Sequence, residues 1–404
     1  MGCDMVLARD SATTARHTLL GVNLFDADRQ RVHLHSHLAE SHPHDAVVHL
    51  SQLNIPQARQ TAAVLGVQIE GAWGFQFGCN HQRVAVGVAC WCSRLPQSGT
   101  GLSGAELVRL ALERGHSARH AVEVLTDLIT RYGQRDADVP ASHVVFLIAD
   151  PHEACVLEVA GCYWALLECG ETRAVADVGL IRQDWKRLSH GLAEQAIMNG
   201  WWNDDGTKLD FAGSMGVNDA AHAWGLKRWS KATLALAQRQ GGLDAYELRR
   251  LLAEQWDVCV RRHELAPRGL RQLGSVVARL DAPGAPLIWF APRPAEAQLF
   301  IPLVVGMELP AMYRVAASES IGLQPARLPS LQGQFDLEAE EYLVEAHELE
   351  LRGESAARAR LAQAMMLRHA EQCEGISGRS LDSPEAARRR PSHAEEEATP
   401  FAFG

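Results

Sequence analysis

The chain has 404 residues, of which 47% are hydrophobic and 22% are charged, a composition typical of a globular protein with a sizeable core. Its formal net charge of −10 argues against nucleic-acid or anionic-membrane binding, because such surfaces draw their affinity from clustered Lys and Arg. The nine cysteines include no CxxC pair and no apolar run is long enough to span a membrane, so we expect a cytoplasmic protein.

A cysteine lies almost at the start of the chain. Cys3 is followed by the apolar stretch Met5–Ala8, which predicts a short strand. If the residues ahead of it were removed, Cys3 would carry a thiol and a free α-amine, and one residue would then supply both nucleophile and general base. The alternative interpretation is a frayed terminus with an incidental buried cysteine.

The first half of the chain predicts mainly strands, interrupted by two helices. A capping box of Ser103 and Glu106 opens a helix that continues to Arg114. Ser117 opens a second helix, which Gly133 ends. Strand patterns occupy residues 17–23, 57–91 in part, 144–149, 154–159 and 162–167, the last three as a meander.

The second half predicts helices followed by strands. Helices are predicted at 186–199 and 246–256, strands at 274–280, 287–290 and 299–305, and one long amphipathic helix after about residue 335. This order of elements predicts an α+β protein with sheets and helices in layers. We therefore expect a main domain of residues 1–334, a helical extension of 335–375 and a disordered, highly charged tail of 376–404.

A series of short motifs extends along most of the chain. Trp73-Gly74 is followed by Gly78-Cys79-Asn80 and then by the run Val84–Gly87. Together these residues resemble the Trp-Gly, Gly-Ala-Asn and Gly signature of the secernins and the related dipeptidases. Further segments resemble the same family in the same order, at 107–115, 146–150, 156–165, 200–202 and 346–348.

The resemblance implies an N-terminal-nucleophile hydrolase fold, which is a four-layer αββα sandwich of two antiparallel sheets between helices. It implies that Cys3 is the nucleophile, freed by removal of a short leader, and that Asn80 donates to the oxyanion. Asn23 matches the family's second strand, and Trp73 is expected to lie at the substrate. The implied activity is hydrolysis of a small peptide or amide, with no cofactor and no metal.

Two segments depart from the family's pattern. The family carries Gly-Lys-Asn-Ser-Asp-Arg after its second strand, whereas this chain has Phe25 at the Asp position, so Asp26, or Asp28 with Arg29, would have to replace the missing polar groups. After the meander the family has Ser-Asn, and this chain has Asp177 preceded by Ala176. Because a carboxylate there would oppose an oxyanion, we assign Asp177 and Arg29 to substrate binding instead.

Processing of the N-terminus needs two steps. Removal of Met1 is expected because Gly2 is small, yet it leaves Gly2 in front of Cys3. The Gly2–Cys3 bond must therefore also be cleaved before the amine exists.

Two other patterns allow more than one interpretation. His33, His35 and His37 alternate and could ligate Zn²⁺ or Ni²⁺ from one face of a strand, but such a pattern is more often a solvated histidine-rich edge strand, and we expect no metal. Cys90 and Cys92 also alternate, which places both thiols on one face of a strand. They could form a redox pair or be two ordinary buried cysteines.

The sequence thus predicts a cysteine-type amide hydrolase or dipeptidase. A catalytically degenerate scaffold that binds a partner, or an acyltransferase on the same fold, are the alternatives. We expect a small peptide or amide partner, no nucleic acid and no membrane, and leave open whether the chain forms a homo-oligomer.

Overall fold

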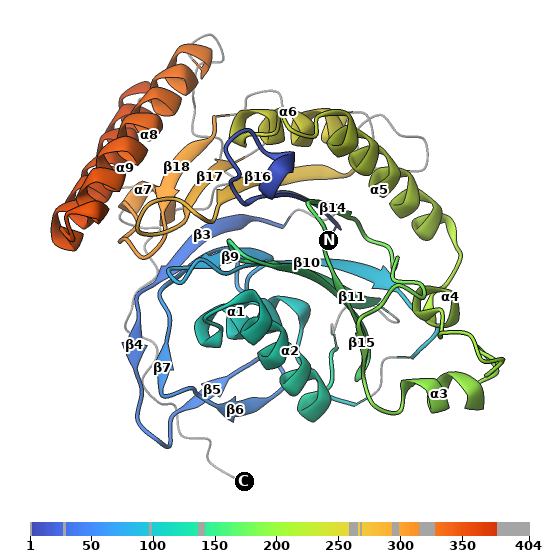
Figure 1. Ribbon diagram of the computed structural model, residues 1–404. Helices are drawn as coiled ribbons and strands as arrows, with labels where there is room; N and C mark the ends of the chain where they lie inside the picture. Colours follow the sequence, from blue (N-terminus) through green and yellow to red (C-terminus); the bar gives the residue numbers. More distant parts are fainter. Residues whose placement is uncertain are drawn as a thin grey trace.

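Two antiparallel sheets lie face to face between layers of helices in the computed structural model (Figure 1). The structure describes residues 2–26, 30–96, 99–135, 142–257, 266, 269–292, 299–314 and 328–377. One sheet has six strands in the order β14-β1-β2-β16-β17-β18, and we call it the β1 sheet. The other has eight strands in the order β15-β13-β12-β11-β10-β9-β8-β3, and we call it the β10 sheet.

The β1 sheet is assembled from both ends of the chain. Its strands are β1 (Gly2–Ala8), β2 (Leu19–Asp26), β14 (Thr172–Val175), β16 (Arg271–Arg279), β17 (Leu287–Pro292) and β18 (Ile301–Val304).

The strands of the β10 sheet all come from residues 32–188, a segment that also contributes β14 to the β1 sheet. The strands of the β10 sheet are β3 (Val32–His37), β8 (Val64–Ile69), β9 (Phe77–Asn80), β10 (Ala85–Cys92), β11 (Ser142–Ala149), β12 (Ala154–Ala160), β13 (Tyr163–Glu168) and β15 (Arg187–Leu188). Two short hairpin pairs extend from it, β4 (Glu40–Ser41) with β7 (Gln60–Thr61) and β5 (Val47–His49) with β6 (Asn54–Pro56).

Strand β1 is covered on both faces, which explains its apolar run from Met5 to Ala8. Its odd-numbered side chains face the β10 sheet, since a Cβ built on Gly87 would lie 2.6 Å from the sulfur of Met5. Its even-numbered side chains face the helices, since a Cβ built on Gly21 would lie 2.9 Å from Val6. This alternation directs Cys3 into the layer between the sheets and Asp4 toward the helices.

Two pairs of helices form the outer layers. Helices α1 (Gly104–Arg114) and α2 (Ala118–Tyr132) cover the β10 sheet, and α5 (Ala220–Gln238) and α6 (Ala245–Gln255) cover the β1 sheet (Figure 1). Both predicted N-caps are confirmed, because Ser103 accepts from the backbone N–H of Glu106 and Ser117 from that of His120. The smaller helical elements are η1 (Asp10–Ala12), α3 (Leu192–Met198), α4 (Phe211–Met215) and α7 (Ala311–Arg314).

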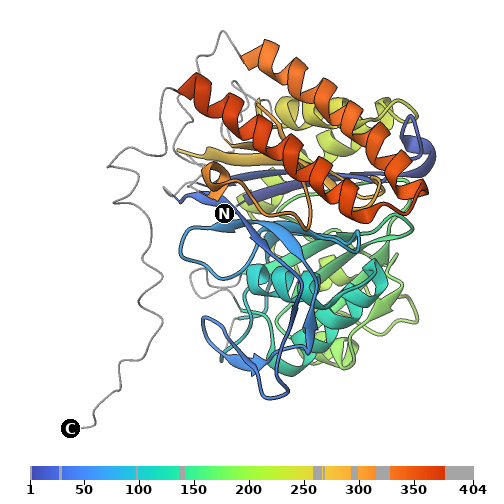
Figure 2. The same ribbon diagram turned by 90° about the vertical axis from the view of Figure 1, so that its left-hand side faces the viewer.

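The C-terminal region is a helical hairpin. Helices α8 (Leu328–Leu351) and α9 (Ser355–Ser377) run side by side and pack against β18 (Figures 1 and 2). The expectation of one long helix was wrong, because Gly353 adopts φ +71° and ends the first helix. The predicted tail lies outside the described residues from 378 onward.

A second element also differs from the prediction. Residues 186–199 were expected to form a helix, but β15 pairs with β13 first and α3 begins only after Gly191, at φ +76°. Tertiary pairing with β13 takes precedence there over local helix propensity. The predicted fold class, an α+β sandwich of two antiparallel sheets with helices and a helical C-terminal region, is confirmed.

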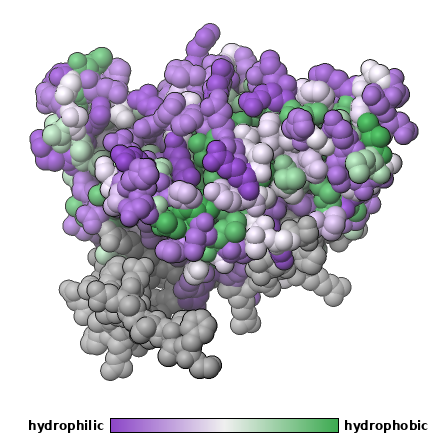
Figure 3. All heavy atoms as spheres, turned by 90° about the horizontal axis from the view of Figure 1, so that it is seen from below, coloured by the Kyte–Doolittle hydropathy of each residue, from purple (hydrophilic) through white to green (hydrophobic). Residues whose placement is uncertain are grey.

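The molecular surface seen from below Figure 1 is mainly hydrophilic, with smaller separate hydrophobic groups (Figure 3). Scattered apolar groups of this kind are normal for a protein surface. Among the described helices, none combines the length and the hydropathy needed to cross a membrane.

Candidate active site

The backbone N–H of Cys3 is bound by a side chain instead of a strand. β14 pairs with β1 only as far as Val175, which lies opposite Met5. Beyond that point the carboxylate of Asp177 accepts the Cys3 N–H, at 3.1 Å to Oδ1 and 3.3 Å to Oδ2. The nitrogen of Cys3 is therefore held beside a fixed negative charge.

Asp177 also joins the two sheets. Its Oδ1 accepts from the backbone N–H of Cys90 on β10 at 3.2 Å, while its Oδ2 accepts from Nη2 of Arg228 at 2.7 Å. A single carboxylate thus fixes the start of β1, the end of β10 and a cation from α5. The predicted site residues Cys3 and Asp177 are brought together by this arrangement.

Arg228 is fully buried and lies between two carboxylates. Its Nη1 donates to Oδ1 of Asp4, and its Nη2 to Asp177. The guanidinium carbon also lies 4.1 Å from the ring centroid of Trp224 and 5.0 Å from that of Phe25. Aromatic faces and paired carboxylates are what a planar guanidinium needs in order to remain charged without water.

Burial dominates the electrostatics of this cluster. It raises the pKa of Asp4 to about 6, although Arg228 acts in the opposite direction. It raises the pKa of the Cys3 thiol well above its usual value, and the charges of Asp177 and Asp4 raise it further. Burial alone would lower the pKa of Arg228, but Asp4 and Asp177 outweigh it and the net shift is upward. With Gly2 in place, Cys3 is therefore a neutral thiol.

An aromatic ring covers the start of β1. Gly2 pairs with Phe25 across the β1–β2 ladder, and a Cβ built on Gly2 would overlap the Phe25 ring. Phe25 is itself fixed by Trp224 and Trp256, with ring centroids 5.9 and 6.2 Å away. Gly2 is partly exposed, whereas Cys3 directly behind it is 2% exposed.

The structure does not bring Asn80 to Cys3. Asn80 lies opposite Val84, just before β10, about six residues and therefore about 20 Å along the strand from Cys90. Its amide nitrogen donates to the carbonyls of Leu112 and Gly115 at 2.9 and 2.7 Å, on the α1 side of the sheet. The amide predicted to donate to an oxyanion instead holds the end of α1, away from Cys3.

The other predicted residues are divided between separate places. Asn23 donates to the carbonyl of Leu252 at 2.7 Å and accepts from Ser275 at 2.6 Å, so its amide fastens α6 to the β1 sheet. Asp26 is buried at the end of β2. Trp73 lies on the α1 side, where the guanidinium of Arg109 stacks 3.9 Å from its ring centroid. Arg29 lies outside the described residues.

Sequence reasoning missed Arg228, which is 224 residues from its partner Asp4. Its signal was present on α5, where the buried positions Trp224, Arg228, Ala232 and Leu236 recur every four residues. An arginine on the buried stripe of a helix requires an acidic partner in the interior.

The histidine-rich segment forms strand β3. The rings of His35 and His37 are 4.4 Å apart on β3, and burial lowers the pKa of His37 to about 3, with Arg109 and His35 acting in the same direction. Among the described residues, no group of three or more His, Cys, Asp and Glu side chains could hold a metal ion.

No protein-family model matches this chain. Three solved structures are similar to it at low sequence identity. A mutant of conjugated bile acid hydrolase from Clostridium perfringens is 11% identical with a TM-score of 0.44 and covers 75% of this chain and 92% of its own. Penicillin V acylase from Agrobacterium tumefaciens is 12% identical with a TM-score of 0.45, covering 75% and 86%. The Caenorhabditis elegans ortholog of N-acylethanolamine-hydrolyzing acid amidase is 11% identical with a TM-score of 0.36, covering 70% and 95%.

Proposed function

We propose that this chain is a cysteine-type N-terminal-nucleophile hydrolase that cleaves a small amide after the residues ahead of Cys3 are removed. One observation supports the proposal above all others. The nitrogen of Cys3 is held 3.1 Å from Asp177, and its thiol is enclosed between the sheets directly behind the partly exposed Gly2. Cleavage of the Gly2–Cys3 bond would create an amine in a place already built to hold it.

The chemistry follows from that cleavage. The new α-ammonium group lowers the pKa of the adjacent thiol, because a positive charge favours the thiolate. After losing its own proton to solvent, the neutral amine takes the thiol proton, sulfur forms a bond to the amide carbon, and the carbon–nitrogen bond breaks as the proton passes to the leaving nitrogen. Water then hydrolyses the thioester and restores the thiol.

Asp177 tunes this amine. A carboxylate at hydrogen-bond distance stabilises the ammonium form and raises the pKa of an α-amine above its ordinary value of about 8. Turnover should therefore increase with pH as the amine loses its proton, at a pKa to which Asp177 contributes an upward shift. Asp177→Asn should move that pKa downward, and the exposed control Asp45→Asn should leave it unchanged.

Within the amide class, we infer a dipeptide-sized substrate, in keeping with the resemblance to secernins and dipeptidases. Asp177 keeps 16% of its side chain exposed, and its negative charge favours a substrate with a free amino group. An acyl group passed to an amine instead of water would give transferase activity from the same thioester, and added hydroxylamine would reveal it.

Mass spectrometry of the mature N-terminus tests the proposal. We expect a chain that begins at Cys3 and hydrolyses dipeptides or aminoacyl anilides. Cys3→Ala should abolish turnover, whereas Cys79→Ala, the loss of another fully buried thiol, should not. A chain found wholly with Gly2 at its start would remove the proposed base.

A non-hydrolytic scaffold is the second candidate. It is favoured by Phe25, which stands where the secernin pattern has an Asp, and by the raised pKa of the buried Cys3 thiol. In that case, Cys3→Ala would retain whatever binding function the chain has.

A further inference from the structure

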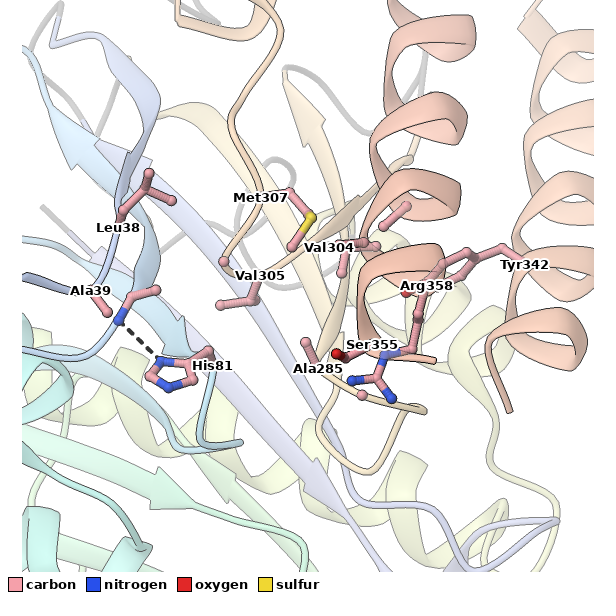
Figure 4. A pocket seen from close by; sticks show the side chains of 15 residues that line it. Leu38, Ala39, His81, Ala285, Val304, Val305, Met307, Tyr342, Ser355 and Arg358 are labelled. Atoms are coloured by element: carbon pink, nitrogen blue, oxygen red, sulfur yellow. Dashed lines mark hydrogen bonds between the residues drawn. The ribbon is translucent and has the colours of Figure 1, made fainter. Parts of the chain in front are cut away.

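A cavity lies between the sandwich and the helical hairpin. It has a volume of about 340 Å³, close to the lower end of the range typical of small-molecule sites. Its walls come from the end of β18, the turn at Gly284, the first turns of α9, and the segments around Leu38 and His81 (Figure 4).

This cavity is remote from Cys3. The strand register connects Val304 through Leu287, Arg279 and Leu19 to Ala8, which is the opposite end of β1 from Cys3. Five residues of extended strand separate the two ends by about 17 Å. The cavity therefore has no part in the chemistry proposed for Cys3.

One side of the cavity is apolar. Val304 and Val305, which are 2% and 1% exposed, lie in its interior with Met307 and Ala285 beside them (Figure 4). A flexible thioether and small side chains adapt to an alkyl or aryl group.

The other side carries a positive charge that is only partly balanced. Arg358 lies directly over Gly284, where a Cβ would overlap its Nε, so the glycine makes room for the guanidinium. Glu350 pairs with Arg358 at 3.6 Å but also with Arg83 at 3.5 Å, and it accepts the Gly284 N–H at 3.1 Å. Within the described part of the chain, two cations thus share this carboxylate.

Uncharged polar side chains also line the cavity. The Nδ1 atom of His81 accepts from the backbone N–H of Ala63 at 3.0 Å, so the neutral ring carries its hydrogen on Nε2 (Figure 4). The hydroxyl-bearing side chains of Ser355 and Tyr342 also line the cavity. Among the described residues that line it, none is acidic.

We propose that this cavity binds a small monoanion with an apolar body, a carboxylate joined to an alkyl or aryl group. The carboxylate pairs with Arg358, and the apolar body packs on Val304, Val305 and Met307. A guanidinium with surplus positive charge recognises the anion, and the enclosed valines favour a ligand larger than acetate.

Three matched probes test both parts of the proposal by calorimetry with the full chain. Phenylbutyrate supplies charge and ring, phenylbutanol the ring alone, and acetate the charge alone. We expect phenylbutyrate to bind at least tenfold more tightly than either of the others, because a hydrogen bond to a charged group contributes about this factor or more.

Variants locate the site. Arg358→Gln should weaken phenylbutyrate at least tenfold and leave phenylbutanol unchanged, while the exposed Arg360→Gln on the same helix should change neither. Ala359→Leu keeps Arg358 but fills the cavity, and should weaken both aromatic probes. Thermal unfolding of each variant confirms that it is folded.

Several results would overturn the proposal. These are equal binding of phenylbutyrate and phenylbutanol, absence of phenylbutyrate binding to the folded wild type, or equal effects of Arg358→Gln and Arg360→Gln. Phenylbutyrate binding should be the same in Cys3→Ala, so failure of the proposed hydrolase and failure of this site are distinguished.

Discussion

Replacement of Asp4 by Asn tests the electrostatics around Arg228 directly. Asp4 is 2% exposed, and its Oδ2 has no hydrogen-bond partner in the described part of the chain. Burial therefore outweighs Arg228 and raises the pKa of Asp4 from its ordinary 3.8 to about 6. The folded state binds more protons than the unfolded state between these values, so this contribution to stability is present at low pH and lost as pH rises through 6.

The size of the effect follows from the same shift. A shift of about two pKa units corresponds to about 3 kcal/mol of pH-dependent stability in total. About 1.4 kcal/mol of this contribution to the free energy of unfolding is lost between pH 5 and pH 8. Asn cannot titrate, and its side-chain oxygen can still accept from Arg228. The difference in the free energy of unfolding between Asp4→Asn and the wild type should therefore shift by about 1.4 kcal/mol in favour of the variant when the pH is changed from 5 to 8.

Urea unfolding of both proteins at the two pH values measures this difference, with the exposed Asp45→Asn as the control. Other titrating groups cancel because they are common to both chains. No change in the difference between pH 5 and pH 8 would refute the reasoning. A change in the opposite direction would show that Arg228 holds the pKa of Asp4 below its ordinary value.

Three further substitutions have defined outcomes. Arg228→Met leaves Asp4 and Asp177 without their cation and should lower the free energy of unfolding by about 3–5 kcal/mol in guanidinium titrations. The loss should be smaller at pH 5 than at pH 8, and a loss independent of pH would contradict the assigned charges. In the unprocessed chain, which still carries Gly2, Gly2→Ala brings a methyl group against the Phe25 ring and should lower the free energy of unfolding by about 1–3 kcal/mol. Phe25→Leu in the same unprocessed chain should relieve this cost, and an equal cost in both backgrounds would mean that the contact is not the cause. His369 is buried in the helical hairpin, and burial lowers its pKa from 6.5 to about 4, so this residue should lower the free energy of unfolding by about 3 kcal/mol as pH falls from 7 to 4, measured as the difference between the wild type and His369→Gln. Thermal unfolding of His369→Gln should show that this acid sensitivity is gone, and an unchanged profile would assign it to another group.

Local sequence signals predicted the elements that depend on local physics. The caps at Ser103 and Ser117 and the meander of β11, β12 and β13 were found where the sequence placed them, because a capping hydroxyl and an apolar run act over a few residues. The break at Gly353 could have been found too, since a glycine inside a long helical pattern is a common helix end.

The site depended on contacts that no local pattern contains. Asp177 was identified by motif comparison, but its hold on the Cys3 nitrogen follows from where β14 ends. Asn80 was chosen from a motif, yet strand alternation and the end of α1 direct its amide away from Cys3. Helix α5 was not predicted at all, because its buried stripe is interrupted by Gly225 and Arg228.

The assembly of the β1 sheet from distant segments has a consequence for the order of events during synthesis. The strands of the β10 sheet all lie between residues 32 and 188, so they can pair while the rest of the chain is still being translated. Strands β1 and β2 emerge first but must wait for β16 and for Arg228 before their surroundings are complete. Any maturation of the N-terminus that relies on the finished site therefore belongs to a late stage, after most of the polypeptide has left the ribosome.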